Sequence, residues 1–302
     1  MKDRESTGLL LSMAGMVTYG LVPVFSHHFS MTMDPLLFAG VGTWVGSLPF
    51  LVQLTVRGSL GELLIPAYRV PFAAIGFFGI VSTLLLFIGT SLTSGLNTGL
   101  LLQVEPFYSV LIAAAFLGER TTLAEAAATL LMILGAAGIV YRGGEGLNVG
   151  DFLILLAPLF QQASHVFTKR IISKLPVVGI IPAVRFFWTG VGVTAIAVAR
   201  NPAVLEQLAS PKAWVGILLF GLVLRALDAW FWYAAIARIS LAKASAVIPL
   251  SVAVSFLGSI LFLRETVERR QVLGLTLIFG GLLWFSWLHW RRVDTEQAHE
   301  PA

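Results

Sequence analysis

The chain has 302 residues, of which 57% are hydrophobic and 12% are charged, and its mean hydropathy is +0.86. Soluble domains carry roughly 25% charged residues, so we expect lipid to cover most of this protein's surface. The sequence contains no cysteine, which excludes disulfides, thiolate catalysis and cysteine-ligated metals. The excess of 20 Lys and Arg over 16 Asp and Glu is assigned to cytoplasmic loops rather than to a nucleic-acid surface.

Along the chain, ten continuous apolar segments reach the roughly 20 residues that a helix needs to cross a bilayer core of about 30 Å. The short segments between them carry charges, Gly and Pro, as turns do. The predicted membrane helices span residues 9–29, 35–56, 68–91, 95–117, 123–141, 151–168, 177–199, 212–237, 241–263 and 271–290. We therefore predict an all-α polytopic membrane protein with one transmembrane domain over 1–302. The first helix is expected to be retained rather than cleaved as a signal peptide, and 292–302 to be a disordered tail.

The two halves of the sequence, 1–146 and 147–291, are similar to each other. Shifting the first half by 143 to 146 residues superposes a Val-x-Pro motif and a Leu-x-Glu turn, which place Val104 and Pro106 on Val247 and Pro249, and Leu117 and Glu119 on Leu263 and Glu265. Each half holds five predicted helices, an odd number, so the second copy enters the membrane upside down. Inverted repeats are typical of secondary transporters, whose substrate site lies near the midplane where the repeats meet.

The distribution of basic residues predicts the orientation of the chain. With both termini inside, twelve Lys and Arg residues between the helices fall on the cytoplasmic side and six on the outer side. Because cytoplasmic loops carry the excess of Lys and Arg, we predict cytoplasmic termini. The expected location is a bacterial-type inner membrane, which the chain crosses many times.

In each half, a helix with an early Pro is followed by a Leu-x-Glu turn and a Gly-rich final helix. The two stretches read VEPFYSVLIAAAFLGERTTLAEAAATLLMILGAAGIV and ISLAKASAVIPLSVAVSFLGSILFLRETVERRQVLGLTLIFGGLLWF. This pattern resembles the two EamA repeats of the drug/metabolite transporter superfamily, over essentially the whole chain. The resemblance implies a ten-helix transporter that exports small amphipathic metabolites, with amino acids the best single substrate class. Family members also export amines, drugs, nucleotide precursors and sugars.

Charged residues inside membrane helices are costly and mark candidate functional positions. Glu105 lies about 15 Å into its predicted helix, at 1.5 Å per residue. A carboxylate there suits proton coupling, and the alternative is a protonated Glu bonded to a neighbouring helix. Arg225 and Asp228 stand at i,i+3. They either neutralise each other, or Arg225 binds a substrate carboxylate while Asp228 holds Arg225 in position. Arg185, in an Arg-Phe pair similar to one in the family, is expected to be structural, because it matches a family motif rather than a family site. In the first half, Gly42 takes its place.

We expect the substrate at the midplane, between the first, third and fourth helices of one repeat and the corresponding helices of the other. Polar residues that loops do not explain gather there: Tyr19, Ser82, Asn97, Gln103, Glu105, Gln162, His165, Arg225, Asp228 and Ser245. A shared wet cavity would avoid the cost of burying them against lipid, about 1–3 kcal/mol each. Alternating access would use bends near the hinge candidates Pro106 and Pro249. Small-residue pairs, Gly42 with Gly46 and Gly95 with Gly99, predict close helix packing.

Catalytic and nucleotide-binding motifs are absent from the sequence, which has no Walker loop, His-Glu-x-x-His, Gly-x-Ser-x-Gly or dinucleotide fingerprint. We therefore do not expect an enzyme, and we expect neither a cofactor nor a metal. The expected partners are a small-molecule substrate and the lipid bilayer, with proton coupling, and no nucleic acid. The rival interpretations are a membrane-embedded enzyme or scaffold that acts on lipid, and a passive channel.

Overall fold

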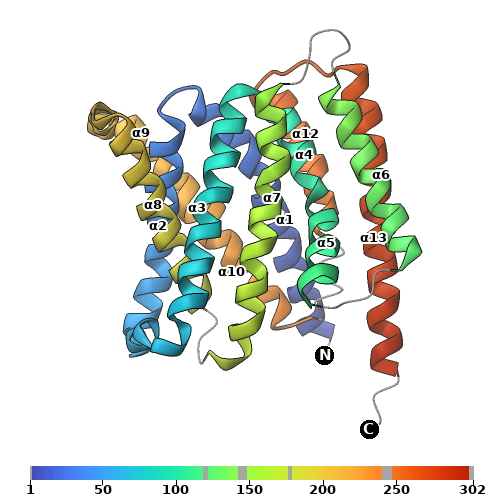
Figure 1. The fold of residues 1–302 in the computed structure, drawn as a ribbon, viewed down its shortest axis with the longest axis horizontal. Helices are drawn as coiled ribbons and strands as arrows, with labels where there is room; N and C mark the ends of the chain where they lie inside the picture. Colours follow the sequence, from blue (N-terminus) through green and yellow to red (C-terminus); the bar gives the residue numbers. More distant parts are fainter. Residues whose placement is uncertain (1, 118–121, 142–147, 176–178, 240–246, 299–302) are drawn as a thin grey trace.

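The computed structural model describes residues 2–117, 122–141, 148–175, 179–239 and 247–298. In these ranges the chain forms helices and no strands. The helices stand side by side in one bundle, and both termini lie at the same end of it (Figure 1). The described residues contain seven helical stretches that are long and apolar enough to cross a membrane, judged by length and composition. The predicted all-α fold class is therefore confirmed.

The first half contains α1 (Lys2–Ser30), α2 (Pro35–Val56), α3 (Arg69–Leu92), α4 (Gly95–Leu101), α5 (Glu105–Leu117) and α6 (Leu123–Val140). The second half contains α7 (Val149–Ile171), α8 (Ile180–Arg200), α9 (Pro211–Leu218), α10 (Asp228–Ile236), α12 (Ser251–Phe262) and α13 (Arg269–Ala298). Short 3₁₀ turns form η1 (Leu60–Leu64), η2 (Pro66–Tyr68), η3 (Leu102–Val104), η5 (Ile172–Lys174), η6 (Pro202–Ala209) and η8 (Ile248–Leu250), and η7 (Leu219–Leu227) is a π-helix.

Two predicted continuous helices are interrupted. The span 95–117 is divided into α4 and α5 by η3, directly before Glu105 and Pro106. A proline has no N–H and its ring crowds the carbonyl four residues earlier, so regular α-helical bonding stops there. The span 212–237 contains η7 between α9 and α10, and π-helical segments frequently mark functional sites.

The end of the chain also differs from the expectation. Helix α13 continues to Ala298, so 292–298, which we predicted to be disordered, is helical.

Pro249 lies within the 3₁₀ turn η8, immediately before α12. Both proline hinge candidates are therefore next to 3₁₀ turns rather than inside continuous α-helices.

Local sequence signals set several helix starts. Asp34 caps α2, where its carboxylate accepts the backbone N–H groups of Leu36 and Leu37, and Arg200 at the end of α8 pairs with it at 2.5 Å. Thr122 and Glu125 form a capping box at the start of α6. Such caps satisfy N–H groups that a helix leaves unpaired in its first turn.

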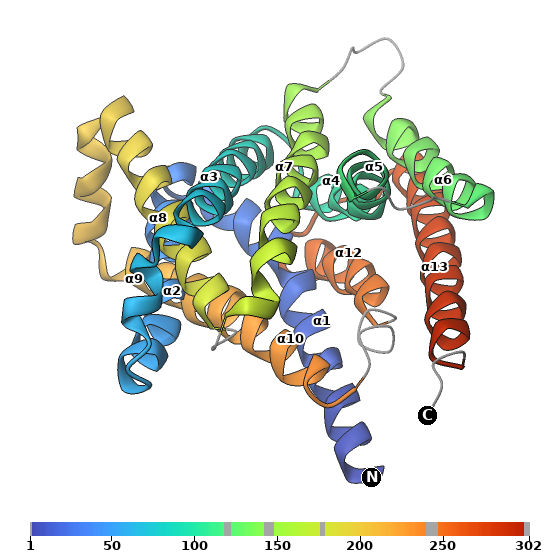
Figure 2. The same ribbon diagram turned by 60° about the horizontal axis from the view of Figure 1, so that its bottom comes forward.

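Helix packing joins the two halves throughout. Helix α3 packs along α7, α2 along α8, α6 along α13, and α1 along α10 and α12. Each of these pairs unites one helix from each half, and α6 and α13 run side by side at one flank (Figure 2). The apolar core follows the same rule, since Phe38 and Phe87 of the first half contact Phe220 of the second. The halves thus form a common interior, in which residues from both can meet.

The predicted small-residue pairs lie where helices approach closely, which confirms that interpretation. A Cβ atom at Gly46 would lie 2.9 Å from the carbonyl oxygen of Gly221 in η7, and one at Gly99 would lie 2.7 Å from the Cβ of Ser255 in α12. Gly42 faces Phe220 and Gly95 faces Leu263 in the same way. A methyl group at these positions would force the helices apart.

Candidate functional site

Glu105, the first residue of α5, is held by two neighbouring helices. The Tyr19 hydroxyl of α1 donates to its Oε2 at 3.0 Å, and the Gln162 amide of α7 donates to its Oε1 at 2.5 Å. Both neighbours are donors, which suits a carboxylate that accepts at both oxygens. The contact to α7 crosses between the halves, so Glu105 lies where the two repeats meet.

Arg225 and Asp228 do not form the ion pair that their spacing predicted, although both lie in the described part of the chain. The carboxylate of Asp228 accepts a 2.7 Å hydrogen bond from Thr18 of α1. The guanidinium of Arg225 lies over the ring of Phe220, with Cζ 4.9 Å from the centroid. Arg225 belongs to the π-helix η7 and Asp228 is the first residue of α10, and the two charges still interact electrostatically.

Arg185 of α8 joins the same region, although the sequence indicated a structural role for it. Its Nη1 lies 3.2 Å from Nε2 of His165 on α7. Because arginine can only donate, this ring nitrogen accepts and the imidazole is neutral. Arg185 also interacts electrostatically with Glu105 and with Tyr233 of α10. Its charge within an apolar span was the signal that could have identified it.

Both arginines keep unused hydrogen-bonding capacity. Among the described residues, Nη2 of Arg185 and Nε of Arg225 are buried and have no hydrogen-bond partner. A buried donor without a partner costs about 1–3 kcal/mol or more when charged. Each of the two arginines therefore has one donor that is unused in this structure.

The central side chains lie among several helices and still keep accessible surface. Glu105, Arg185, Arg225 and Asp228 are half-buried, and His165 is exposed. These side chains therefore keep some accessible surface, whereas the described pockets of about 330 and 350 Å³ are lined by other residues.

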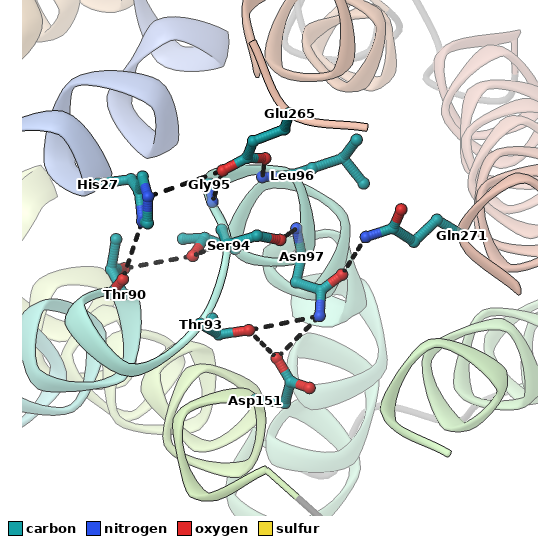
Figure 3. Close-up of polar contacts among 11 residues, drawn as sticks. His27, Thr90, Thr93, Ser94, Gly95, Leu96, Asn97, Asp151, Glu265 and Gln271 are labelled. Atoms are coloured by element: carbon teal, nitrogen blue, oxygen red, sulfur yellow. Dashed lines mark hydrogen bonds and ion pairs between the residues drawn. The ribbon is translucent and has the colours of Figure 1, made fainter. Parts of the chain in front are cut away.

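The remaining predicted site residues have different surroundings. Ser82 donates to the carbonyl oxygen of Ala157 at 2.9 Å, and Gln103 approaches Ser251 at 3.5 Å, so both link helices of the two halves. Asn97 lies in the first turn of α4, where it contacts Thr93, Asp151 and Gln271 (Figure 3) rather than the central charges. Ser245 is outside the described residues.

The predicted residues that the structure brings together are Tyr19, Glu105, Gln162, His165, Arg225 and Asp228. Thr18 and Arg185 join them, and the list drawn from the sequence omitted both.

Comparison with known families decides the classification. Residues 6–141 and 148–287 each match the EamA-like transporter family. The chain belongs to this family. The resemblance seen in the sequence is thereby confirmed, and membership places this EamA protein among multi-pass membrane transporters rather than enzymes.

Two individual proteins show what this EamA protein is similar to. The probable terminal-alkyne amino-acid exporter of Streptantibioticus cattleyicolor is 29% identical over 190 residues, a match that spans 62% of this chain and 62% of that protein. A protein of known crystal structure, 17% identical in sequence, superposes with a TM-score of 0.67 over 96% of this chain and 99% of its own. The second likeness concerns the fold alone.

Proposed function

We propose that this protein is a secondary transporter that exports small amphipathic metabolites, amino acids first among them. The observation that carries the proposal is the central group of charges. It combines two arginines that have unused donors with two carboxylates, and residues of both halves supply it. A zwitterionic amino acid carries one group of each sign, a carboxylate that suits the arginines and an ammonium that suits a carboxylate.

Opposite charges divide the binding roles. Arg185 and Arg225 offer N–H groups to the substrate carboxylate, since a guanidinium can bind both carboxylate oxygens. Asp228 accepts from the substrate ammonium, while Thr18 and Tyr19 hold the carboxylates of Asp228 and Glu105 in position. Substrates that lack either charge leave one set of buried groups unpaired, which lowers their affinity.

The named relative supports the substrate class. The matched protein is called a probable amino-acid exporter, and the match covers about three fifths of its length. For the present chain, amino-acid substrates and the outward direction are part of the proposal. The repeat architecture supports alternating access, in which the halves move against each other around a fixed site.

We also propose proton coupling and an orientation. Glu105 lies in the site and could carry a proton in one direction and release it in the other. Both termini lie at one end of the bundle (Figure 1), and the Lys and Arg distribution assigns that end to the cytoplasm of a bacterial-type inner membrane.

Transport by the purified protein in liposomes tests the proposal. We expect saturable uptake of a labelled amino acid, accelerated by unlabelled amino acid on the opposite side and competed by it on the same side. Flux that rises linearly with concentration would identify a channel instead. Chemical change of the liposome lipids without any flux would favour the membrane-embedded enzyme. Protein-free liposomes are the control.

A further inference from the structure

At the end of the bundle opposite the termini, Glu265 connects the two halves (Figure 3). It lies in the segment between α12 and α13, and its carboxylate reaches the first turn of α4. The backbone N–H groups of Gly95 and Leu96 donate to its two oxygens, each at 2.7 Å. A carboxylate at a helix start is stabilised by these hydrogen bonds and by the helix dipole.

Further side chains connect helices at the same end of the bundle. His27 of α1 places Nε2 3.7 Å from the Glu265 carboxylate and Nδ1 3.1 Å from the carbonyl oxygen of Thr90 on α3. Asn97 of α4 donates to Asp151 of α7 at 3.1 Å and accepts from Gln271 of α13 at 2.7 Å. Elements of both halves thus meet around the start of α4 (Figure 3).

The backbone before Glu265 is in an unusual conformation. Arg264 has a φ of 55° and is the one non-glycine residue with positive φ in the described chain. This conformation is unfavourable for a residue with a Cβ, and such strain is found at switch regions. The turn directs Glu265 from its own helix pair toward α4 in the other half.

The contact can open at moderate cost. A pocket of about 330 Å³ adjoins it, lined by Ser94, Asn97, Arg264, Glu265, Thr266, Glu268, Arg270 and Gln271. Water in this pocket can hydrate the Glu265 carboxylate and the N–H groups of Gly95 and Leu96 after they separate. The side chain of Ser94 still caps α4 by accepting from Asn97 at 3.0 Å, so α4 keeps part of its cap.

We propose that Glu265 is the latch of a gate at this end of the bundle. The gate is closed while the Glu265 carboxylate caps α4, and it opens when this carboxylate leaves the start of α4. This inference rests on the proposed transport function. Helix α4 is joined to Glu105 by the three residues of η3. A movement of α4 that follows release of Glu265 therefore reaches the central site through a short and direct connection.

Cysteine labelling tests the latch without a transport assay. The sequence has no cysteine, so Ser251→Cys provides the one reactive thiol. Ser251 is fully buried at the start of α12, roughly 18 Å along that helix from Leu263 at 1.5 Å per residue. The probe is a membrane-impermeant maleimide, added from the side opposite the termini to membranes that contain the full-length protein.

Glu265→Gln should accelerate labelling of this thiol by roughly tenfold, the population shift expected from losing one charge-assisted hydrogen bond. The matched control is Glu268→Gln in the same segment, which removes a carboxylate that pairs with Arg270 rather than with α4 and should leave the rate unchanged. Equal rates in Glu265→Gln and the unaltered background would overturn the proposal.

A second thiol separates opening from unfolding. Thr129→Cys lies in α6 and is 4% exposed, away from the gate. In protein that carries Thr129→Cys and keeps Ser251, adding Glu265→Gln should leave the thiol at position 129 unreactive. If Glu265→Gln exposes both thiols, Glu265 is only a structural cap and the latch is refuted. Because labelling needs no substrate, a liposome assay without flux would leave this result intact.

Discussion

The guanidinium of Arg225 lies over the ring of Phe220, and its Nε has no hydrogen-bond partner among the described residues. A charged group in this state gains most from an anionic ligand, because binding pairs a donor that is otherwise buried and unsatisfied. The same holds for Arg185. At the scale of single residues, we therefore expect the site to bind carboxylates.

Arg225→Ala should weaken binding of carboxylate-bearing substrates by roughly tenfold or more, as expected for losing a hydrogen bond to a charged group. Amines and neutral analogues should be affected less. Competition against labelled amino-acid uptake in liposomes measures both. Arg200→Ala, which removes an arginine on the surface, is the control and should retain normal affinities. Equal loss for carboxylates and amines would contradict the assigned role.

Glu105→Gln keeps the size of the side chain and mimics the protonated acid. We expect it to preserve folding and substrate exchange and to remove the pH dependence of net flux, because the variant cannot gain or lose a proton at this position. Exchange and net flux measured across a pH series check this. Glu206→Gln, on the exposed part of η6, should behave like the unaltered protein. A variant whose net flux still follows pH would assign the coupling to another group.

At the scale of elements, we expect α1 and α12 to separate and approach near the latch during transport. Val24 of α1 and Gly258 of α12 lie close to that end, and a Cβ at Gly258 would be 3.8 Å from the Cβ of Val24. This is the usual Cβ separation of a disulfide. Val24→Cys with Gly258→Cys should therefore cross-link on oxidation, stop transport, and recover on reduction. Transport by each single variant should be insensitive to oxidant. Undiminished flux in the oxidised double variant would show that transport does not need α1 and α12 to separate at this position.

Helix α2 packs on the π-helix η7 through glycine. Gly46→Ala would place a methyl carbon 2.9 Å from the carbonyl oxygen of Gly221, so overpacking should destabilise the fold by about 1–3 kcal/mol. Gly138→Ala in α6 is the matched control, since nothing lies within 4 Å of its added Cβ and alanine favours helix. Thermal unfolding in detergent should show a lower midpoint for the first variant alone. A midpoint of Gly46→Ala equal to that of Gly138→Ala would argue against close packing.

At the scale of the whole molecule, both termini share one end of the bundle (Figure 1). With the majority of loop Lys and Arg residues at that end, we expect it to face the cytoplasm. An alkaline-phosphatase fusion at the C-terminus should be inactive, and a fusion in the segment between α1 and α2 should be active. An active C-terminal fusion would reverse the proposed orientation.

Sequence by itself determined the fold class and the family. Long apolar segments have few stable alternatives to helices in lipid, because each backbone N–H and C=O must be paired within its own segment. The repeated Leu-x-Glu turn and Val-x-Pro motif were enough to identify EamA repeats. Glu105, Gln162 and Arg225 could be named as site candidates for a similar reason, since polar groups inside such helices stand out.

Tertiary structure alone decided which of these groups meet. Arg225 lies over Phe220 of its own π-helix η7, and Arg185 enters the site because α8 packs against α2 and α3 of the other half. Glu265 appeared in the sequence only as a marker of the repeat, while its contact with α4 spans 170 residues. Long-range pairings of this kind arise from how the halves pack together, and local sequence patterns carry no direct record of them.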